Sequence, residues 1–111
     1  MLSHKQEIYV AMVGALANVY SNSQWDQRLG DQKAADAARL TDAYYEARKQ
    51  AKSMEPSNLR DICAQEVLAN LVLKSGEVTM TEAECKKLAE KAFSIADFAA
   101  AAFAKNNLAT V

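Results

Sequence analysis

The residues that most often carry out catalysis are scarce in this chain of 111 amino acids. It contains one histidine, His4, and two cysteines, Cys63 and Cys85. A cysteine nucleophile needs a nearby base, and His4 is the only imidazole available to act as one. The same histidine has no second histidine or pair of thiols beside it in the sequence, so it is a poor zinc ligand. We therefore expect no catalytic residue and no metal site, with His4 exposed to solvent.

The two cysteines have a simpler interpretation as ordinary helix residues. They are too few for a disulfide-rich scaffold, and Cys63 and Cys85 both fall within apolar helical patterns. We expect buried free thiols in a reducing cytoplasm. An intrachain disulfide stays open as an alternative, because sequence spacing does not fix the distance between two sulfur atoms.

Short motifs of metal, redox and nucleotide chemistry are missing. The sequence has no H-E-x-x-H, C-x-x-C, G-x-G-x-x-G or G-K-[ST] pattern. Glu66, Glu84 and Glu90 lie in predicted helices, but none has the histidine partner that carboxylate-bridged metal bundles use. Glu66 shares an i, i+4 stripe with Asn70 and Lys74, which we expect to face solvent rather than form a buried polar site. The sequence thus predicts a protein that is not an enzyme and has no cofactor.

One stretch combines basic and aromatic side chains in the way that nucleic-acid-binding helices do. Three carboxylates are interspersed among these side chains, and the whole chain has 13 Lys and Arg against 14 Asp and Glu. This balance produces no bulk positive field that would attract DNA. A plain solvent-exposed surface is therefore the simpler interpretation, and a DNA-associated regulator is the alternative function. The basic and aromatic residues are Arg39, Tyr44, Tyr45, Arg48, Lys49 and Lys52.

Composition predicts an all-α fold. Half of the residues are hydrophobic, and the chain has only three glycines and one proline. Such a composition favours helices and leaves few of the turn residues that many short strands would need. A chain of this length is typical of one domain. We expect residues 1–111 to form a single compact bundle of four main helices, with a short helical turn between the first two.

Capping signals predict where the first helices begin. Ser3 and Gln6 form a capping box for a helix that runs to about Tyr20. The segment SQWDQRLG then predicts a short helical turn, in which Gly30 either closes the turn or lies inside a longer helix. Asp31 is the expected cap of the second main helix.

The second helix is expected to be the outer, solvent-exposed one and to end near Ser53. Pro56 marks the next joint, and the third helix is expected over about 58–75, ending at Gly76. Thr81 and Glu84 form the capping box of the fourth helix. Hydrophobic staple positions beside this box are held by Met80 and Cys85, and the expected apolar stripe of the second helix consists of Ala34, Ala37, Leu40, Tyr44, Ala47 and Ala51.

The fourth helix carries more apolar surface than one packing face needs. At about 100° per residue, its apolar side chains cover an arc of about 200°, whereas a surface helix needs about 100°. The third helix is also apolar nearly all round, in its segment VLANLVLK. Because two of the four helices need additional cover, we expect a homodimer or a comparable protein interface. The residues expected to self-associate are Ala92, Ala96, Ala99, Ala100 and Phe103.

Two aromatic residues are candidate contacts to a protein partner. Phe98 interrupts the polar arc of the fourth helix, and Trp25 is the only tryptophan, in a polar segment. Large, rigid aromatic side chains contribute most of the binding energy in many interfaces. Two interpretations of Trp25 stay open, a plug at the end of the bundle or an exposed anchor.

The segment IYVAMVGALA, residues 8–17, has the length of a signal-peptide core, and its last three residues imitate a cleavage site. Glu7 lies where a signal peptide would be positively charged, so we expect an uncleaved amphipathic helix. No apolar run reaches the roughly 20 residues of a membrane span. A cytoplasmic location without membrane contact is the expectation.

The segment LAEKAFSIADFAAAAF, residues 88–103, resembles the C-terminal segment of small helical proteins common in bacteriophages and prophages. The shared features are an alanine and aromatic run and the Ile-Ala-Asp triplet at 95–97. The resemblance implies a non-enzymatic accessory protein of phage or mobile-element origin. Some such proteins inhibit a host assembly by occupying its surface, including CRISPR and other defence complexes. We therefore expect a protein-binding module that acts as a steric inhibitor.

Overall fold

The computed structural model describes residues 2–19, 22–50, 57–75 and 80–105. These ranges contain four α-helices, α1 (His4–Ala17), α2 (Gln27–Gln50), α3 (Ser57–Lys74) and α4 (Glu82–Lys105), and the short 3₁₀ helix η1 (Asn22–Gln24). They contain no strand. The predicted all-α bundle of four main helices, with a helical turn after the first, is confirmed.

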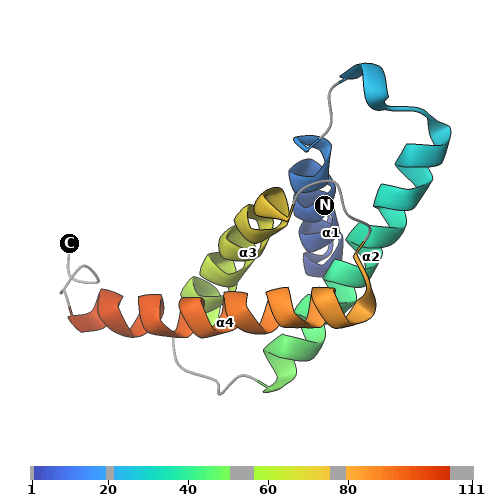
Figure 1. Ribbon diagram of the computed structural model, residues 1–111. Helices are drawn as coiled ribbons and strands as arrows, with labels where there is room; N and C mark the ends of the chain where they lie inside the picture. The colour runs from blue at the N-terminus through green and yellow to red at the C-terminus, as the bar shows by residue number, and fades with distance from the viewer. Residues whose placement is uncertain (1, 20–21, 51–56, 76–79, 106–111) are drawn as a thin grey trace.

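The four helices do not all run alongside one another. Figure 1 shows α1, α2 and α3 running up, down and up in turn, with α4 crossing in front of α2 and α3. Both α2 and α3 pack against α1 on one side and against α4 on the other. The last turns of α4 extend beyond α3 (Figure 1). The side of α4 that faces away from the bundle is therefore left without a neighbouring helix among the described residues.

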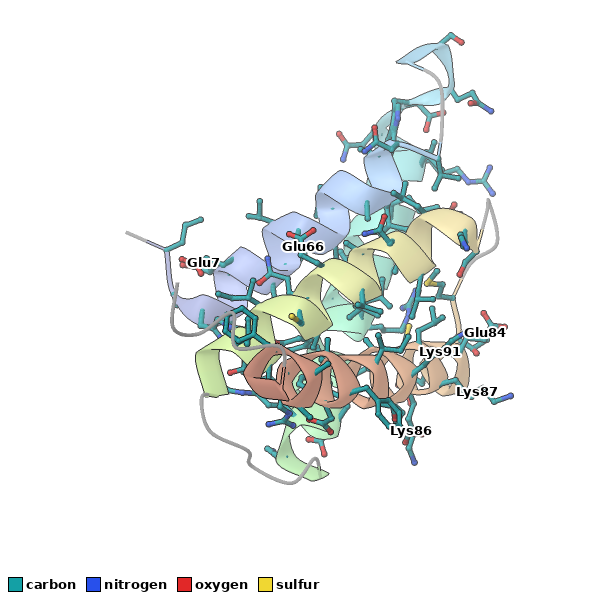
Figure 2. All side chains as sticks on the ribbon, turned by 90° about the vertical axis from the view of Figure 1, so that its left-hand side faces the viewer. Glu7, Glu66, Glu84, Lys86, Lys87 and Lys91 are labelled. Atoms are coloured by element: carbon teal, nitrogen blue, oxygen red, sulfur yellow. The ribbon has the colours of Figure 1, made fainter. Side chains whose placement is uncertain are left out.

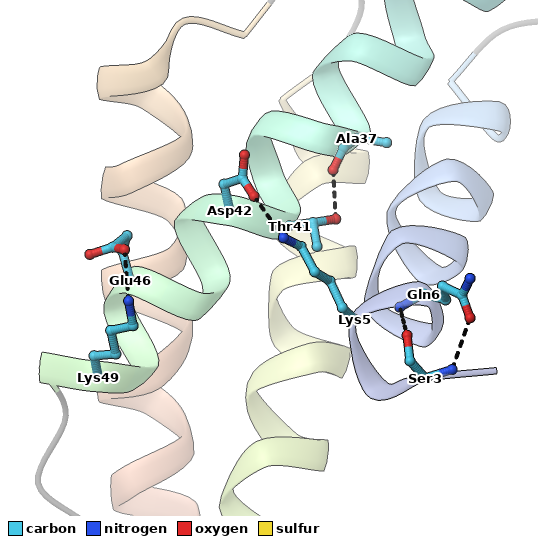
Figure 3. A network of polar contacts seen from close by, with 8 residues as sticks. All are labelled: Ser3, Lys5, Gln6, Ala37, Thr41, Asp42, Glu46 and Lys49. Carbon is cyan, nitrogen blue, oxygen red and sulfur yellow. Dashed lines mark hydrogen bonds and ion pairs between the residues drawn. The ribbon is translucent and has the colours of Figure 1, made fainter.

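The predicted caps form as short-range hydrogen bonds. The Gln6 backbone N–H donates to Ser3 Oγ at 3.2 Å, and the Ser3 N–H donates to Gln6 Oε1 at 2.9 Å, which closes the capping box (Figure 3). At α4 the Glu84 N–H donates to Thr81 Oγ1 at 3.2 Å. Such bonds satisfy backbone donors that have no partner within the helix. They explain why the starts of α1 and α4 were predictable.

The start of α2 differs from the expectation. Asp31 is not the cap, because α2 begins at Gln27 and Asp26 caps it: the Leu29 N–H donates to Asp26 Oδ1 at 2.7 Å. Gly30 lies inside the helix, at a position where an added Cβ would meet nothing within 4 Å. A glycine inside a helix costs about 1 kcal/mol, which this early cap and the later turns of α2 offset. Gln27 and Asp31 instead form a side-chain hydrogen bond of 2.8 Å within the first turns.

The expectation that α2 is the outer, solvent-exposed helix holds only in part: Asp42, Glu46 and Lys49 are exposed, but polar residues beside its apolar stripe are covered. Asp36 is completely buried, with Lys33 Nζ at 3.1 Å and Arg39 Nη2 on its two carboxylate oxygens. Arg39 Nε also donates to the backbone carbonyl of Met80 at 3.0 Å, which ties α2 to the start of α4. Because α4 crosses α2 at this level, a charged face that would suit solvent is covered, and its carboxylate is neutralised by two cations.

The core takes one face from each of the four helices. The predicted stripe of α2 is largely correct, with Ala37, Leu40, Tyr44 and Ala47 buried, Ala34 half-buried and Ala51 outside the described residues. The expected polar stripe of α3 is exposed, as predicted: Glu66, Asn70 and Lys74. The full set of buried hydrophobic residues is Ile8, Met12, Ala15, Leu16, Ala37, Leu40, Tyr44, Ala47, Ala64, Leu68, Val72, Met80, Cys85, Ala89, Ala92, Phe93 and Ala96.

Candidate functional site

The basic residues in the second half of α2 are occupied by ion pairs within the chain. Arg48 makes two contacts with Asp61 of α3, from Nη2 to Oδ2 at 2.8 Å and from Nε to Oδ1 at 3.3 Å. Lys49 Nζ lies 3.3 Å from Glu46 Oε1 (Figure 3). Lys52 lies outside the described residues. Phosphate groups would have to compete with these carboxylates, so the pairs weigh against a nucleic-acid site on this part of α2.

The two tyrosines beside this basic group join helices. Tyr44 is buried, its hydroxyl donates to the backbone carbonyl of Asp61 at 3.1 Å, and its ring centroid lies 4.9 Å from that of Phe93 on α4. Burial first, and then the Asp61 carboxylate, raise the pKa of the Tyr44 phenol, so that it stays a neutral donor. Tyr45 shares a hydrogen bond with Nδ1 of His4, which is exposed as expected. The buried Tyr44 ring cannot stack on a nucleobase.

Arg60 in the first turn of α3 and Asp97 in the C-terminal half of α4 form an ion pair between the two helices. Arg60 Nε lies 2.7 Å from Asp97 Oδ1, without hydrogen-bond geometry, and Arg60 is only 3% exposed. Arg60 Cζ lies 5.0 Å from the centre of the Phe93 ring, which adds a cation–π contact. Asp97 is one of the few charged residues of the alanine-rich segment, and its role is to hold α4 against α3.

The described residues offer no metal site and no activated thiol. They contain no group of three or more histidine, cysteine, aspartate or glutamate side chains that could hold an ion. Cys63 and Cys85 are both free thiols, with Cys85 buried as predicted and Cys63 half-buried. Burial raises the pKa of the Cys85 thiol to about 11, so it stays protonated and unreactive near neutral pH.

Phe98 is the most exposed large hydrophobic residue in the described part of the chain, with 78% of its surface accessible. One turn earlier Ile95 is 39% exposed, and Ala99 and Ala102 are exposed as well. These four positions follow i, i+3, i+4, i+7 spacing, which places them together on one side of α4. Part of the apolar arc predicted for this helix, at Ile95, Ala99 and Ala102, is thus uncovered, and Phe98 from the predicted polar arc lies beside it as the largest exposed side chain.

Trp25 is less well placed as an anchor. It is half-buried and lies between η1 and α2, outside the cluster of core residues. Figure 1 shows η1 and the first turn of α2 projecting beyond the end of α1. Both interpretations of Trp25, a plug at the end of the bundle and a contact to a partner, stay predictions.

The residues predicted to self-associate are divided between the core and the surface. Ala92 and Ala96 are completely buried within the single chain, so they are not available to a second copy, and this part of the prediction is corrected. Ala99 is exposed, while Ala100 and Phe103 are half-buried. Where α4 crosses α2 and α3, the side that carries Ala92 and Ala96 is covered, whereas the last turns of α4 stay partly exposed.

Two lysines precede the exposed apolar residues on the same side of α4. Lys87 and Lys91 are exposed, and at 100° per residue each lies about 20° from Phe98 around the helix. Neither forms an ion pair with a carboxylate of the described residues. Figure 2 shows Lys87 pointing away from the other helices. We call this side of the helix the outer strip, defined by Lys87, Lys91, Ile95, Phe98 and Ala102.

A shallow hollow of about 340 Å³ opens at the N-terminal end of the outer strip. Its walls are mostly apolar, and Leu88 is half-buried there. The hollow has room for a side chain of a partner that lies along α4. Its lining residues are Ser75, Met80, Glu84, Lys87 and Leu88.

A second hollow, of about 380 Å³, lies between α2 and the start of α4. Its rim carries both signs of charge, Arg39 and Lys86 against Asp42, Glu46 and Glu82. Neighbouring opposite charges weaken each other's field, so this hollow favours neither an anion nor a cation.

Comparisons of the chain with protein-family models, with curated proteins and with solved structures found no match. Within the described ranges, no helix combines the length and the apolar character that crossing a membrane requires. The functional assignment therefore depends on the geometry of α4.

Proposed function

We propose that this protein is a non-enzymatic interaction module that binds a protein partner through the outer strip of α4. The observation that supports this most is the 78% exposure of Phe98 on a helix whose opposite side lies in the core. Burying such a side chain stabilises a complex by about 1.5–3 kcal/mol. A partner that covers Phe98 gains this free energy, which makes Phe98 the central anchor.

The anchor is held in place before binding. Asp97, the residue before it, is paired with Arg60, and Phe93 and Ala96 fix the inner side of the same helix in the core. A rigid helix loses little conformational entropy when it binds. The outer strip therefore has the character of a preformed binding surface rather than of a segment that folds on its partner.

We extend the proposal to the mode of action. A small rigid module without catalytic groups acts most simply by steric blocking, as a phage or mobile-element accessory protein in the host cytoplasm that occupies the surface of a host assembly. The resemblance of residues 88–103 to such proteins supports this part, and it suggests a defence complex such as a CRISPR effector as one target.

A homodimer is a second candidate, favoured by the partly open last turns of α4. Ala99 is exposed and Phe103 is half-buried there, and a small side chain such as that of alanine allows the backbone of a second copy to approach closely. Light scattering at micromolar concentration should then give twice the mass of one chain. Replacing Ala99 by glutamate should reduce the measured mass to that of one chain. An unchanged mass would exclude a dimer interface at this position.

Site-specific photo-crosslinking tests the interaction module directly. A photoreactive phenylalanine analogue at position 98 should give a discrete adduct with a partner protein in a lysate of the host. The same analogue in place of Glu66, an exposed residue on α3, serves as the matched control and should give none. The proposal is refuted if position 98 gives no adduct, or only those seen from position 66.

A further inference from the structure

The outer strip changes in character along α4. Its N-terminal half carries Lys87 and Lys91, and its C-terminal half carries Ile95 and Phe98. Six of the eleven Lys and Arg side chains that the structure describes have a carboxylate partner, and Lys87 and Lys91 are among the five that have none. The paired cations are Lys5, Lys33, Arg39, Arg48, Lys49 and Arg60.

We infer that the partner presents an acidic amphipathic helix to the outer strip. Its carboxylates meet Lys87 and Lys91, and its apolar side chains cover Ile95 and Phe98. This inference rests on the proposed function of α4 as a binding surface and adds the chemistry of the partner. Its basis is charge complementarity, because two exposed ammonium groups without an intramolecular partner lie in line with the anchor.

The length and shape of the outer strip suit a helix. The twelve residues from Lys87 to Phe98 are separated by eleven rises of 1.5 Å, or about 16 Å, which corresponds to about three turns of a second helix laid along α4. The hollow beside Leu88 accepts an apolar side chain from the first of these turns. Glu84 lies at the rim of the same hollow. Its charge repels acidic groups at that end of the strip, so the carboxylates of the partner lie between Lys87 and Lys91.

Two other occupants fit the outer strip less well. A membrane-surface helix needs a clear excess of cations on its polar face, whereas Glu84 and Glu90 are exposed on α4 and the chain has a net charge of −1. A second copy could present the exposed side of α3, but among the described residues Glu66 is the only exposed carboxylate of that helix, near Ile62 and Leu73. One carboxylate does not match two lysines.

A displayed library of random 16-residue peptides tests the inference with a defined probe. The library is selected on the wild-type chain after depletion on the Phe98→Asp variant. Selected peptides should combine at least two acidic residues with apolar residues at helical spacing. Their affinity should fall about tenfold or more on a Lys87→Glu, Lys91→Glu double variant, because two ion pairs become repulsive. Peptides selected from the same library on that double variant should carry basic residues instead of acidic ones.

Matched variants separate the possible outcomes. Lys74→Glu, the same charge change on the exposed side of α3, should leave the selected peptides bound. Selected peptides that depend on Phe98 but are neutral or basic would refute the inference of an acidic partner. They would still support the proposal that α4 is a protein-binding surface. A selection that enriches nothing over the Phe98→Asp variant would overturn both. The protein could instead bind phosphatidylcholine–phosphatidylserine vesicles or form a dimer, and lose that binding in the Lys87→Glu, Lys91→Glu variant. Such a result would overturn the acidic helix in favour of a membrane surface or a second copy.

Discussion

Removing the Asp97 carboxylate should destabilise the fold by more than the exposure of this residue suggests. Arg60 stays charged at any accessible pH, and in Asp97→Ala it would lie in the core at 3% exposure without a counter-ion. Breaking a fully buried pair in this way costs about 3–5 kcal/mol. The Asp97 side chain is 37% exposed, so water screens the pair from one side. We therefore expect a smaller loss, about 2–3 kcal/mol.

The two partners should behave differently. In Arg60→Met the remaining Asp97 carboxylate can be solvated at its exposed side, and the methionine can still pack on Phe93, so we expect a loss of about 1–2 kcal/mol. The double variant Arg60→Met, Asp97→Ala should be more stable than Asp97→Ala alone, because no uncompensated charge stays in the core. Asp42→Ala is the control, since its pair with Lys5 at 3.5 Å is exposed on both sides and should contribute less than about 1 kcal/mol.

Urea unfolding followed by far-ultraviolet circular dichroism measures these free energies. A loss of 2–3 kcal/mol should also lower Tm by roughly 10 °C or more in a domain of this size. If Asp97→Ala unfolds within 0.5 kcal/mol of Asp42→Ala, the Arg60 guanidinium does not depend on this carboxylate. If the double variant is as unstable as Asp97→Ala, the loss comes from packing rather than from a buried charge. Either result would refute the electrostatic explanation.

Three further predictions test other parts of the structure. Stability should fall as pH rises above about 9. Burial raises the folded-state pKa of both Cys85 and Tyr44 above their unfolded values of 9.0 and 10.0. The stabilisation is therefore fully present below the unfolded pKa values and is lost as pH rises toward the folded-state pKa values. Urea midpoints from pH 8 to 11 measure this fall. In Cys85→Ala the decrease in stability nearest pH 9 should be less steep, and an unchanged slope would contradict the contribution of Cys85. Ala89→Leu should cost about 1–3 kcal/mol by overpacking the core, whereas Ala101→Leu on the exposed side of α4 should be nearly neutral in the same urea assay. Duplex DNA at low salt should not retain the protein on a column, because Arg48 and its neighbours are paired within the chain; salt-dependent retention would instead support the DNA-associated regulator.

Local signals account for what could be predicted most securely. The caps at Ser3 and Thr81 are bonds between residues three positions apart, so the sequence contains both partners. The same holds for the stripe of Glu66, Asn70 and Lys74, whose shared side follows from helical spacing alone. Asp26 was missed as a cap because Gly30 imitated a helix end four residues later.

The candidate site could be predicted only in part. The helical wheel showed that α4 has too much apolar surface and that Phe98 lies outside its apolar arc. It did not show which alanines of that arc are buried within the chain, so Ala92 and Ala96 were assigned to an interface that they do not reach. The unpaired state of Lys87 and Lys91 was missed as well, since it depends on where the carboxylates of other helices lie.

The sequence by itself determined that the chain is helical, where α1 and α4 begin, and that α4 carries surplus apolar surface, because these follow from bonds and spacings within a few residues. Only the tertiary structure decided that Asp36 is buried and that Arg60 meets Asp97, because both depend on the crossing of α4 over α2 and α3. The same crossing selects which side of α4 faces solvent. The direction in which two helices cross depends on the packing of side chains far apart in the sequence. It decides that the side of α4 on which the sequence places Phe98 has no neighbouring helix among the described residues.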